Sequence, residues 1–590
     1  MKYLLFATSL MIIIATYGCK PQAAGSTESN TKNNTDSTFA AFENRFLDAY
    51  WKQHPSAAIF VGYGKYYENL VIPDSVSVTN NINFSKAWID SLQTNDLSKL
   101  SDNNKISFNI IKNQLESDIW YQAVFKQQEW DASIYNLAGE CDYLLNQPYA
   151  PLDARLKILS QHLQHADDYY KAGLASLRRP TKEHIELAIL QNQGGLSLFG
   201  AALTDSINAS HLSSADKDAL KQNIAKTVEA INQYIVVLKG IVANKKAEYR
   251  DFNIGKKLFT EKFKYDLATD FTPEQLYDKA TADKKAYTHR MVETANGLWA
   301  KYYNAQTKPT DSLKLIQMVL DKIQLQHAKP ADFFNALTSQ VHQLKKFIIE
   351  KNLFDFDTVS PPIVVRIMPE YARGFSIASA EFTPPYQKQG TTYYNIDDLT
   401  KFPTEKAESA LRELNNYASQ LLSIHEAVPG HCVQGIYNNK KSPDVLRSVF
   451  QNGAMIEGWA VYTESMMLEN GWADHAPEME LVHDKLKLRE LANVIIDYDI
   501  QVLNKPKEDI LHLLVVDCFQ TNAQAEEKYH RATVSQVQLC SYYTGATAIQ
   551  ALRDDYQKKM GDKYSLKDFH EKFLSFGSSP VKYIRERMLQ

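Results

Sequence analysis

The sequence predicts a mainly α-helical protein with one large domain from residue 39 to residue 590. Apolar residues recur at helical spacings, as in Phe42, Phe46 and Tyr50, which indicates helices with one buried face. Glycine and proline are few, with 22 and 20 among 590 residues, and no linker of low complexity interrupts this range. No 34-residue helical repeat is visible, which disfavours a solenoid. One continuous helical domain is therefore favoured over a string of small modules.

Residues 1–18 have the pattern of a secretory signal peptide. Lys2 precedes an apolar run over residues 4–15 that is too short to span a bilayer. Gly18 followed by Cys19 resembles the cleavage site of bacterial lipoproteins, in which the cysteine is lipidated and becomes the mature N-terminus. We expect a protein of the bacterial cell envelope, periplasmic or on the outer surface, with the lipid on Cys19 as its only membrane contact; a free secreted protein is the alternative.

A polar segment follows the signal. Residues 19–38 contain no large apolar side chain and are rich in Ser, Thr and Asn, so we expect them to form a disordered tether. Four more cysteines follow at wide spacings that fit neither a disulfide framework nor a CxxC metal motif. We expect them to be buried free thiols: Cys141, Cys432, Cys518 and Cys540.

The charge balance excludes one large class of partner. The chain has 65 Lys and Arg against 69 Asp and Glu, a net charge of −4. A nucleic-acid-binding protein normally carries a strongly basic domain or stripe. We therefore expect no nucleic-acid partner.

Residues 360–397 differ from the rest of the chain. They contain β-branched and aromatic runs bounded by proline, as in PPIVVRIMP and TTYYNI. The sequence predicts a small insert with strands directly before the most informative helix.

That helix is predicted to begin at about Glu405 and to reach His425. Its apolar residues follow spacings of three and four: Leu411, Leu414, Ala418 and Leu421. A lone histidine on this stripe would be interpreted as a core residue. Here His425 opens the sequence HEAVPGH, which begins like the HExxH zinc helix but carries its second histidine, His431, two residues late.

Residues six apart in a regular helix are rotated by about 240° and cannot face one metal ion. Pro429, however, cannot donate a hydrogen bond to the carbonyl of His425, so the helix must break, and Gly430 gives the chain freedom to turn back. The two inserted residues can therefore restore convergence of His425 and His431 on one zinc ion. Glu426, next to the first histidine, is placed as the general base.

A catalytic zinc needs a third protein ligand and an open position for water. The sequence IEGWAVYTE, residues 456–464, offers Glu457 and Glu464, seven apart along one apolar helix face. Buried carboxylates on such a face are costly without a cation. We assign Glu457 as the ligand and Glu464 as a partner that supports the ligands from behind; the reverse assignment stays open.

HEAVPGH followed by EGWAVYTE resembles the bacterial family known as domain of unknown function 885, a set of predicted zinc-dependent enzymes distantly similar to the glutamate-zincin peptidases. The resemblance covers most of the mature chain. It implies a helical enclosure with a central cleft, metal positions at His425, His431 and Glu457, and Glu426 as the base. Gln501 departs from the family's pattern, which has a histidine there, so the sequence assigns it no substrate role.

A peptidase also needs a donor for the oxyanion beyond the metal. Tyr542 and Tyr543 are candidates, with two core aromatic residues as the equal alternative. His530 and Arg531 could contact a transition-state oxygen or a substrate carboxylate, but a surface cluster is our preferred interpretation. A separate set at helical spacing predicts a buried polar network that supports the site: Arg489, Asn493 and Asp497.

The sequence thus predicts zinc-dependent hydrolysis of short peptides by a metal-activated water. Two alternatives remain: a non-catalytic helical lipoprotein that binds peptides or oligosaccharides, and a zinc hydrolase that acts on another amide or an ester. No GxSxG, P-loop or GxGxxG motif is present. Cys432 has no identifiable base and orienting residue, which disfavours a cysteine hydrolase.

Overall fold

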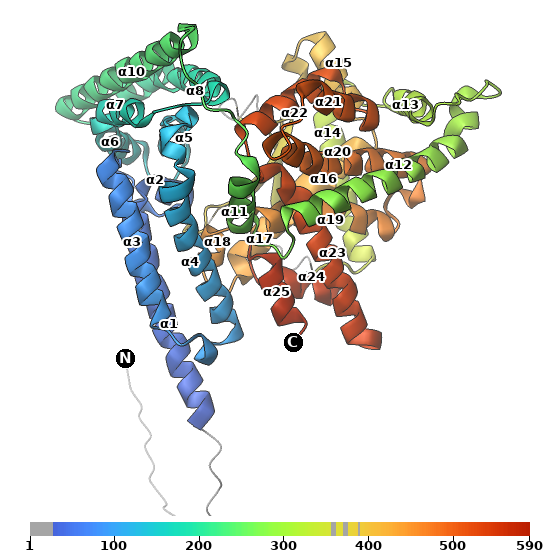
Figure 1. The fold of residues 1–590 in the computed structure, drawn as a ribbon, viewed down its shortest axis with the longest axis horizontal. Coiled ribbons are helices and arrows are strands. Elements are labelled where there is room, and N and C mark those ends of the chain that lie inside the picture. The colour runs from blue at the N-terminus through green and yellow to red at the C-terminus, as the bar shows by residue number, and fades with distance from the viewer. Residues whose placement is uncertain (1–26, 356–361, 370–375, 388–389) are drawn as a thin grey trace, which may run out of the picture.

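The computed structural model describes residues 27–355, 362–369, 376–387 and 390–590. Over these residues the protein is mainly helical with one small sheet, which confirms the predicted fold class. Figure 1 shows an N-terminal arm, built from α1–α10, beside a larger C-terminal body, built from α11–α25 and the sheet.

The N-terminal arm consists of α1 (Thr27–Gln53), α2 (Pro55–Phe60), α3 (Ser75–Gln93), α4 (Asp102–Trp120), α5 (Ala138–Asn146), α6 (Leu152–His162), α7 (Ala166–Ser176), α8 (Lys182–Gly195), α9 (Ala201–Ala209) and α10 (Ser214–Ala243). Polar residues set several of the helix starts. The Asp74 carboxylate, for example, accepts a hydrogen bond of 2.8 Å from the backbone N–H of Ser77 at the start of α3.

The C-terminal body consists of α11 (Gly255–Leu267), α12 (Pro273–Tyr303), α13 (Ser312–Ile323), α14 (Pro330–Glu350), α15 (Thr404–Glu413), α16 (Ala418–Glu426), α17 (His431–Lys441), α18 (Leu446–Val449), α19 (Gly453–Glu469), α20 (Pro477–Gln501), α21 (Lys507–His512), α22 (Asn522–Val534), α23 (Ser541–Met560), α24 (Leu566–Leu574) and α25 (Val581–Met588). Nearly every residue of α20 is buried, so this helix passes through the centre of the body.

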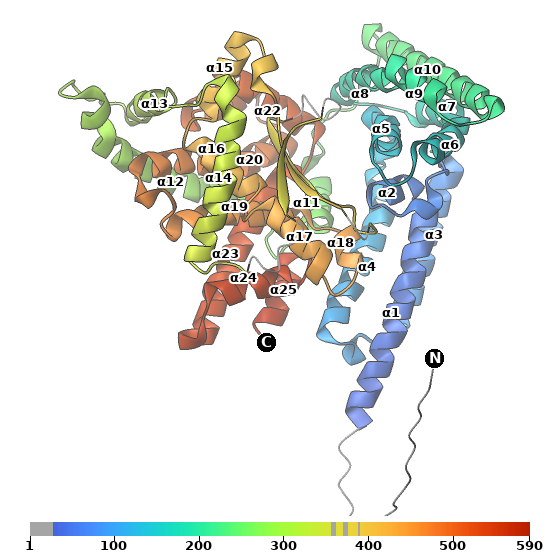
Figure 2. The ribbon, with the colours of Figure 1, turned by 180° about the vertical axis from the view of Figure 1, so that it is seen from behind.

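The sheet has three strands, β1 (Ile363–Ile367), β2 (Ala378–Glu381) and β3 (Thr392–Ile396), in the order β1-β3-β2. All three lie within the insert predicted at residues 360–397. β3 runs parallel to β1 and antiparallel to β2, and Tyr394 in its centre is fully buried. The sheet packs against α16 and α17 (Figure 2), the two helices that carry the HEAVPGH sequence.

The arm and the body share contacts at several points. Leu446 of α18 joins a buried cluster with the aromatic residues of α1. The Trp51 indole N–H donates to the Tyr386 hydroxyl at 2.9 Å, and the Ser107 hydroxyl donates to Asp444 at 2.8 Å. The base of the arm is thus packed onto the body near α18.

The described chain begins inside the range predicted as a tether. α1 starts at Thr27, so helical backbone extends into the range 19–38, while Phe39 is the first core residue described. The signal segment and Cys19 lie outside the described residues. In the described part of the chain, no helix has both the length and the apolar character needed to cross a membrane. The four cysteines of the domain are buried free thiols, as predicted.

The single helix predicted from Glu405 to His425 is two helices, α15 and α16. The break has a local cause: the side-chain oxygen of Asn415 accepts hydrogen bonds from the backbone N–H groups of Tyr417 (3.0 Å) and Ala418 (3.2 Å). This asparagine competes with the helical hydrogen-bond pattern and starts α16. The apolar stripe survives the break, since Leu411 and Leu421 are both buried.

Candidate metal centre

The turn between α16 and α17 brings the two histidines of HEAVPGH together. α16 ends at Glu426, before Pro429, and α17 begins at His431. The backbone N–H of Gly430 donates to the Ile424 carbonyl at 2.9 Å, which folds the turn tightly back on α16. A Cβ at Gly430 would lie 1.8 Å from the carbonyl oxygen of His425. Glycine is therefore required by this close approach, and not by a positive φ, because its φ is −68°.

Trp459 of α19 fixes the same turn from the other side. Its indole N–H donates to the Pro429 carbonyl at 3.0 Å, and its side chain is fully buried. The EGWA segment thus supplies Glu457 as a candidate ligand and, two residues later, the side chain that holds the turn between the histidines.

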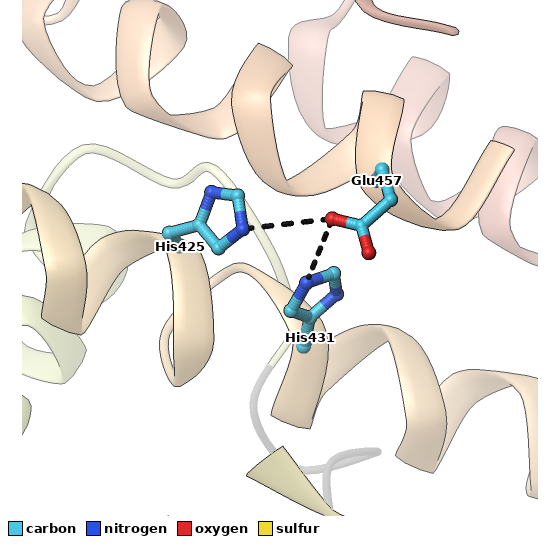
Figure 3. Close-up of side chains that lie close together, drawn as sticks. All are labelled: His425, His431 and Glu457. Atoms are coloured by element: carbon cyan, nitrogen blue, oxygen red, sulfur yellow. Dashed lines mark ion pairs between the residues drawn. The ribbon is translucent and has the colours of Figure 1, made fainter. Parts of the chain in front are cut away.

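His425, His431 and Glu457 converge from three helices, α16, α17 and α19 (Figure 3). The carboxylate oxygen Oε2 of Glu457 lies 3.8 Å from Nε2 of His425 and 3.6 Å from Nε2 of His431. One ligand atom from each residue lies within 4.8 Å of those of the other two. The two imidazole rings are nearly perpendicular, at 89°.

This geometry fits the donor set of a zinc site. Zinc binds histidine nitrogen and carboxylate oxygen at about 2.0–2.2 Å, so ligand atoms at tetrahedral corners lie about 3.4 Å apart. The two distances to Glu457 exceed this value by only a few tenths of an ångström. Three protein ligands also leave one tetrahedral position for water, the arrangement of catalytic zinc sites.

Glu464 occupies the far side of His425. Its Oε1 lies 2.7 Å from Nδ1 of that histidine, whereas Glu457 faces Nε2. A carboxylate on the second ring nitrogen orients a ligating histidine and makes it a stronger donor. Glu457 and Glu464 thus face opposite ring nitrogens of His425, and the assignment of Glu457 as ligand and Glu464 as its support stays a prediction.

The electrostatics favour a positive charge at this position. Burial lowers the pKa of His425, but the hydrogen bond and charge of Glu464, with the charges of Glu426 and Glu457, outweigh it and raise the pKa to about 9. Burial raises the pKa of Glu457, yet the nearby His431 and His425 bring it below its usual value. The carboxylates thus raise the pKa of His425, and the two imidazoles lower the pKa of Glu457.

Gln434 supports the second histidine, a role that sequence reasoning missed. Its side-chain oxygen lies 3.4 Å from Nδ1 of His431, and its amide nitrogen donates to the Met455 carbonyl at 3.4 Å. The available signal was its position three residues after His431, where a side chain shares the histidine's helix face.

A cavity of about 250 Å³ adjoins the metal cluster. His425, Glu426, Glu464 and Tyr542 all line it, so the structure brings the predicted base and one predicted oxyanion donor to the same space as the candidate ligand His425. The Tyr542 hydroxyl lies 3.5 Å from Nη2 of Arg531, which lines the cavity as well.

Tyr543 does not join this site. Its hydroxyl donates to Asp283, and it lines a different cavity. Consecutive residues on α23 point about 100° apart, and here Tyr542 lines the cavity beside His425 while Tyr543 lines the other one. The structure therefore does not bring Tyr543 to the cavity beside His425, whereas Tyr542 lines that cavity and stays the candidate donor.

The remaining predicted residues form separate contacts rather than one network. Arg489 contacts Glu413 at 3.3 Å and lines the cavity, whereas Asp497 accepts from the Cys540 thiol at 3.6 Å. Asn493 accepts from the Lys528 ammonium at 2.5 Å.

Three further positions behave differently from one another. Gln501 is occupied by two backbone hydrogen bonds, and His530 is exposed outside the cavity, while Arg531 is exposed but lines it.

Comparison with known proteins identifies the family. Residues 55–588 match the bacterial proteins of unknown function grouped as DUF885. The chain belongs to this family. No curated protein matches the chain.

Two solved structures share the fold over most of the chain. A protein described as a putative lipoprotein of unknown function from Shewanella oneidensis is 41% identical, with a TM-score of 0.86 over 94% of this chain and 100% of that one. Another, described as a putative lipoprotein from Colwellia psychrerythraea, is 15% identical, with a TM-score of 0.75 over 94% of this chain and 98% of that one. The second likeness concerns the fold alone. The DUF885 fold thus occurs in proteins described as lipoproteins.

Proposed function

We propose that this DUF885 protein is a zinc-dependent hydrolase of peptide bonds in short peptides. The observation that carries the proposal is the convergence of Nε2 of His425 and Nε2 of His431 on one oxygen of Glu457, at 3.8 and 3.6 Å. The motif alone would not support it, because its two histidines are six residues apart. The tight turn at Gly430 supports it.

The residues of the site have separate roles in the proposed reaction. His425, His431 and Glu457 would hold the metal, and Glu464 keeps the His425 ring oriented through Nδ1. Zinc, when bound, lowers the pKa of a coordinated water towards about 7 and polarises a carbonyl. Glu426 takes a proton from the attacking water and returns it to the leaving amine. Tyr542 donates a hydrogen bond to the oxygen that becomes negative.

The cavity supports a small substrate. At about 250 Å³ it accommodates a few residues of an extended peptide and not the surface of a folded protein. We place the enzyme at the bacterial cell envelope, anchored through Cys19, in keeping with the lipoprotein descriptions of its structural neighbours.

Metal content and turnover test the proposal together. Purified protein should contain about one zinc per chain, and a panel of fluorogenic peptides should be hydrolysed until a chelator removes the metal. Glu426→Gln should keep the zinc and lose about 10²- to 10⁴-fold in kcat. Glu405→Gln, on the exposed side of α15, is the matched control and should leave both unchanged. Protein that takes up no zinc after reconstitution, or full activity in Glu426→Gln, would refute the assignment.

A further inference from the structure

The cavity beside the metal cluster has a basic wall as well as an acidic one. Three cationic side chains line it together with His425 and Glu426: Arg489 of α20 and Lys528 and Arg531 of α22. The proposed hydrolysis uses none of them. They belong to two helices that share contacts, and they face the same space as the candidate ligand His425.

Lys528 is the unusual member of this basic cluster. It is only 9% exposed, and among the described residues its ammonium has one hydrogen-bond partner, the neutral Asn493 amide oxygen at 2.5 Å. A buried ammonium is normally paired with a carboxylate, because an unpaired buried charge is costly. Burial and the charges of Arg489 and Arg531 lower the pKa of Lys528 well below its usual value. An anion among the three would relieve this cost.

The two arginines have few carboxylate partners. Arg531 donates to neutral groups, the Gln538 side chain at 2.8 Å and the Tyr542 hydroxyl at 3.5 Å. Arg489 contacts Glu413 at 3.3 Å, but the same carboxylate also accepts from Lys485 at 3.3 Å. Within the described part of the chain, the contact between Arg489 and Glu413 is therefore the only ion pair that the three cationic side chains form.

We propose that the basic cluster of Arg489, Lys528 and Arg531 binds a carboxylate of the substrate in the cavity beside the metal centre. Guanidinium groups hold a carboxylate through paired N–H donors, and a buried ammonium adds a charge-assisted hydrogen bond. The carboxylate comes from one of two sources, the C-terminus of the peptide or an Asp or Glu side chain. The inference deepens the proposed function and rests on it, since it assigns the position of the substrate relative to the bond that is cleaved.

Binding to a protein that cannot turn over separates the two proposals. Isothermal titration calorimetry on zinc-loaded Glu426→Gln would compare three probes: N-acetyl-Ala-Ala-Ala as the free acid, the same peptide as its C-terminal amide, and N-acetyl-Ala-Ala-Glu amide. A hydrogen-bonded charge pair corresponds to about a 10- to 100-fold difference in Kd. We expect the free acid to bind more tightly than the Ala-Ala-Ala amide by this factor. Tight binding of the Glu amide as well would assign the side chain as a source.

Variants of the cluster show where the preference arises. Lys528→Met and Arg531→Gln should each reduce the ratio of acid to amide affinity towards one. Arg531 is exposed, so its variant keeps the test valid if Lys528→Met fails to fold. Lys507→Gln is the matched control: Lys507 is 44% exposed, pairs with Glu526 of α22 at 2.7 Å and lies outside the cavity lining, so the ratio should stay at the wild-type value.

The outcomes are distinct. Equal affinity for all three probes, or an unchanged ratio in both cluster variants, would overturn the carboxylate site. A ratio that falls as much in Lys507→Gln would show general electrostatic attraction and overturn it too. If the wild-type enzyme hydrolyses no peptide in the turnover assay while these affinities follow the expected pattern, the proposed hydrolysis fails and the carboxylate site stands.

Discussion

Gly430→Ala tests whether the turn between α16 and α17 builds the metal site. An alanine Cβ at this position would lie 1.8 Å from the carbonyl oxygen of His425 and 2.4 Å from that of Ile424. Real Cβ atoms essentially never approach heavy atoms closer than 3.0 Å. The overlap is with backbone, which has no rotamer to change, so the turn must open by at least 3.0 − 1.8, or about 1.2 Å.

The required opening is large on the scale of metal coordination. Metal–ligand distances are reproduced within about 0.2 Å in real sites, so a displacement of about 1.2 Å between the two histidines is roughly six times that tolerance. Loss of a group behind a ligand costs about 10- to 100-fold in metal affinity, and loss of a ligand costs more. We therefore expect Gly430→Ala to weaken zinc binding more than 100-fold, with an overpacking cost of about 1–3 kcal/mol in the free energy of unfolding.

Competition with a fluorescent chelator measures the zinc affinity, and thermal unfolding of the metal-free protein reports the fold. Gly453→Ala is the matched control, because Gly453 begins α19 near the site and a Cβ there meets no heavy atom within 4 Å. It should bind zinc as the wild type does. A folded Gly430→Ala protein with wild-type zinc affinity would refute the argument that this close approach sets the ligand geometry.

Other substitutions test the surroundings. Glu464→Ala removes the carboxylate that contacts Nδ1 of His425, so it should lower zinc affinity about 10- to 100-fold in the same competition assay. An unchanged affinity would contradict the supporting role of Glu464. Tyr542→Phe should lower kcat about 10²- to 10³-fold, whereas Tyr543→Phe should change only thermal stability; the opposite pattern in peptide turnover would reassign the oxyanion donor. Burial raises the pKa of Asp497 to about 8, well above its unfolded value near 3.9, so its contribution to stability is full below about pH 4 and is lost as pH rises towards 8, at up to about 1.4 kcal/mol per pH unit. Asp497→Asn should abolish this loss, and urea unfolding curves that shift with pH as in the wild type would contradict it.

The convergence of the two histidines could be predicted from the sequence because its signals are local. His425, Pro429, Gly430 and His431 lie within seven residues, and elementary helix geometry already shows that their spacing needs a break. The fold class followed from apolar periodicity, and the strand-bearing insert followed from β-branched runs between prolines. These features depend on neighbours in the chain, which the sequence displays directly.

The remaining features depend on tertiary contacts. Nothing near Lys528 in the sequence shows that it is buried beside two arginines, one of which comes from α20. The break at Asn415 depends on its side-chain oxygen, which accepts hydrogen bonds from backbone N–H groups and so interrupts the helical hydrogen-bond pattern. Tyr542 and Tyr543 are equivalent by residue type, and only the orientation of α23 separates them.

Three glycines near the candidate metal site allow close backbone approaches. Among the described glycines, a Cβ would come within 3.0 Å of backbone atoms of a different segment or turn only at Gly430, Gly458 and Gly545. Gly430 joins the two histidines. Gly458 follows Glu457 and meets the backbone of Gly545 in α23, so that α19, which carries a ligand, and α23, which carries Tyr542, cross in direct contact. A core stabilised by burial alone does not need such approaches, since larger side chains would bury more apolar surface. Gly430 and Gly458 each lie next to a candidate metal ligand in the chain, so we expect these close approaches to position the candidate ligands and Tyr542 relative to one another.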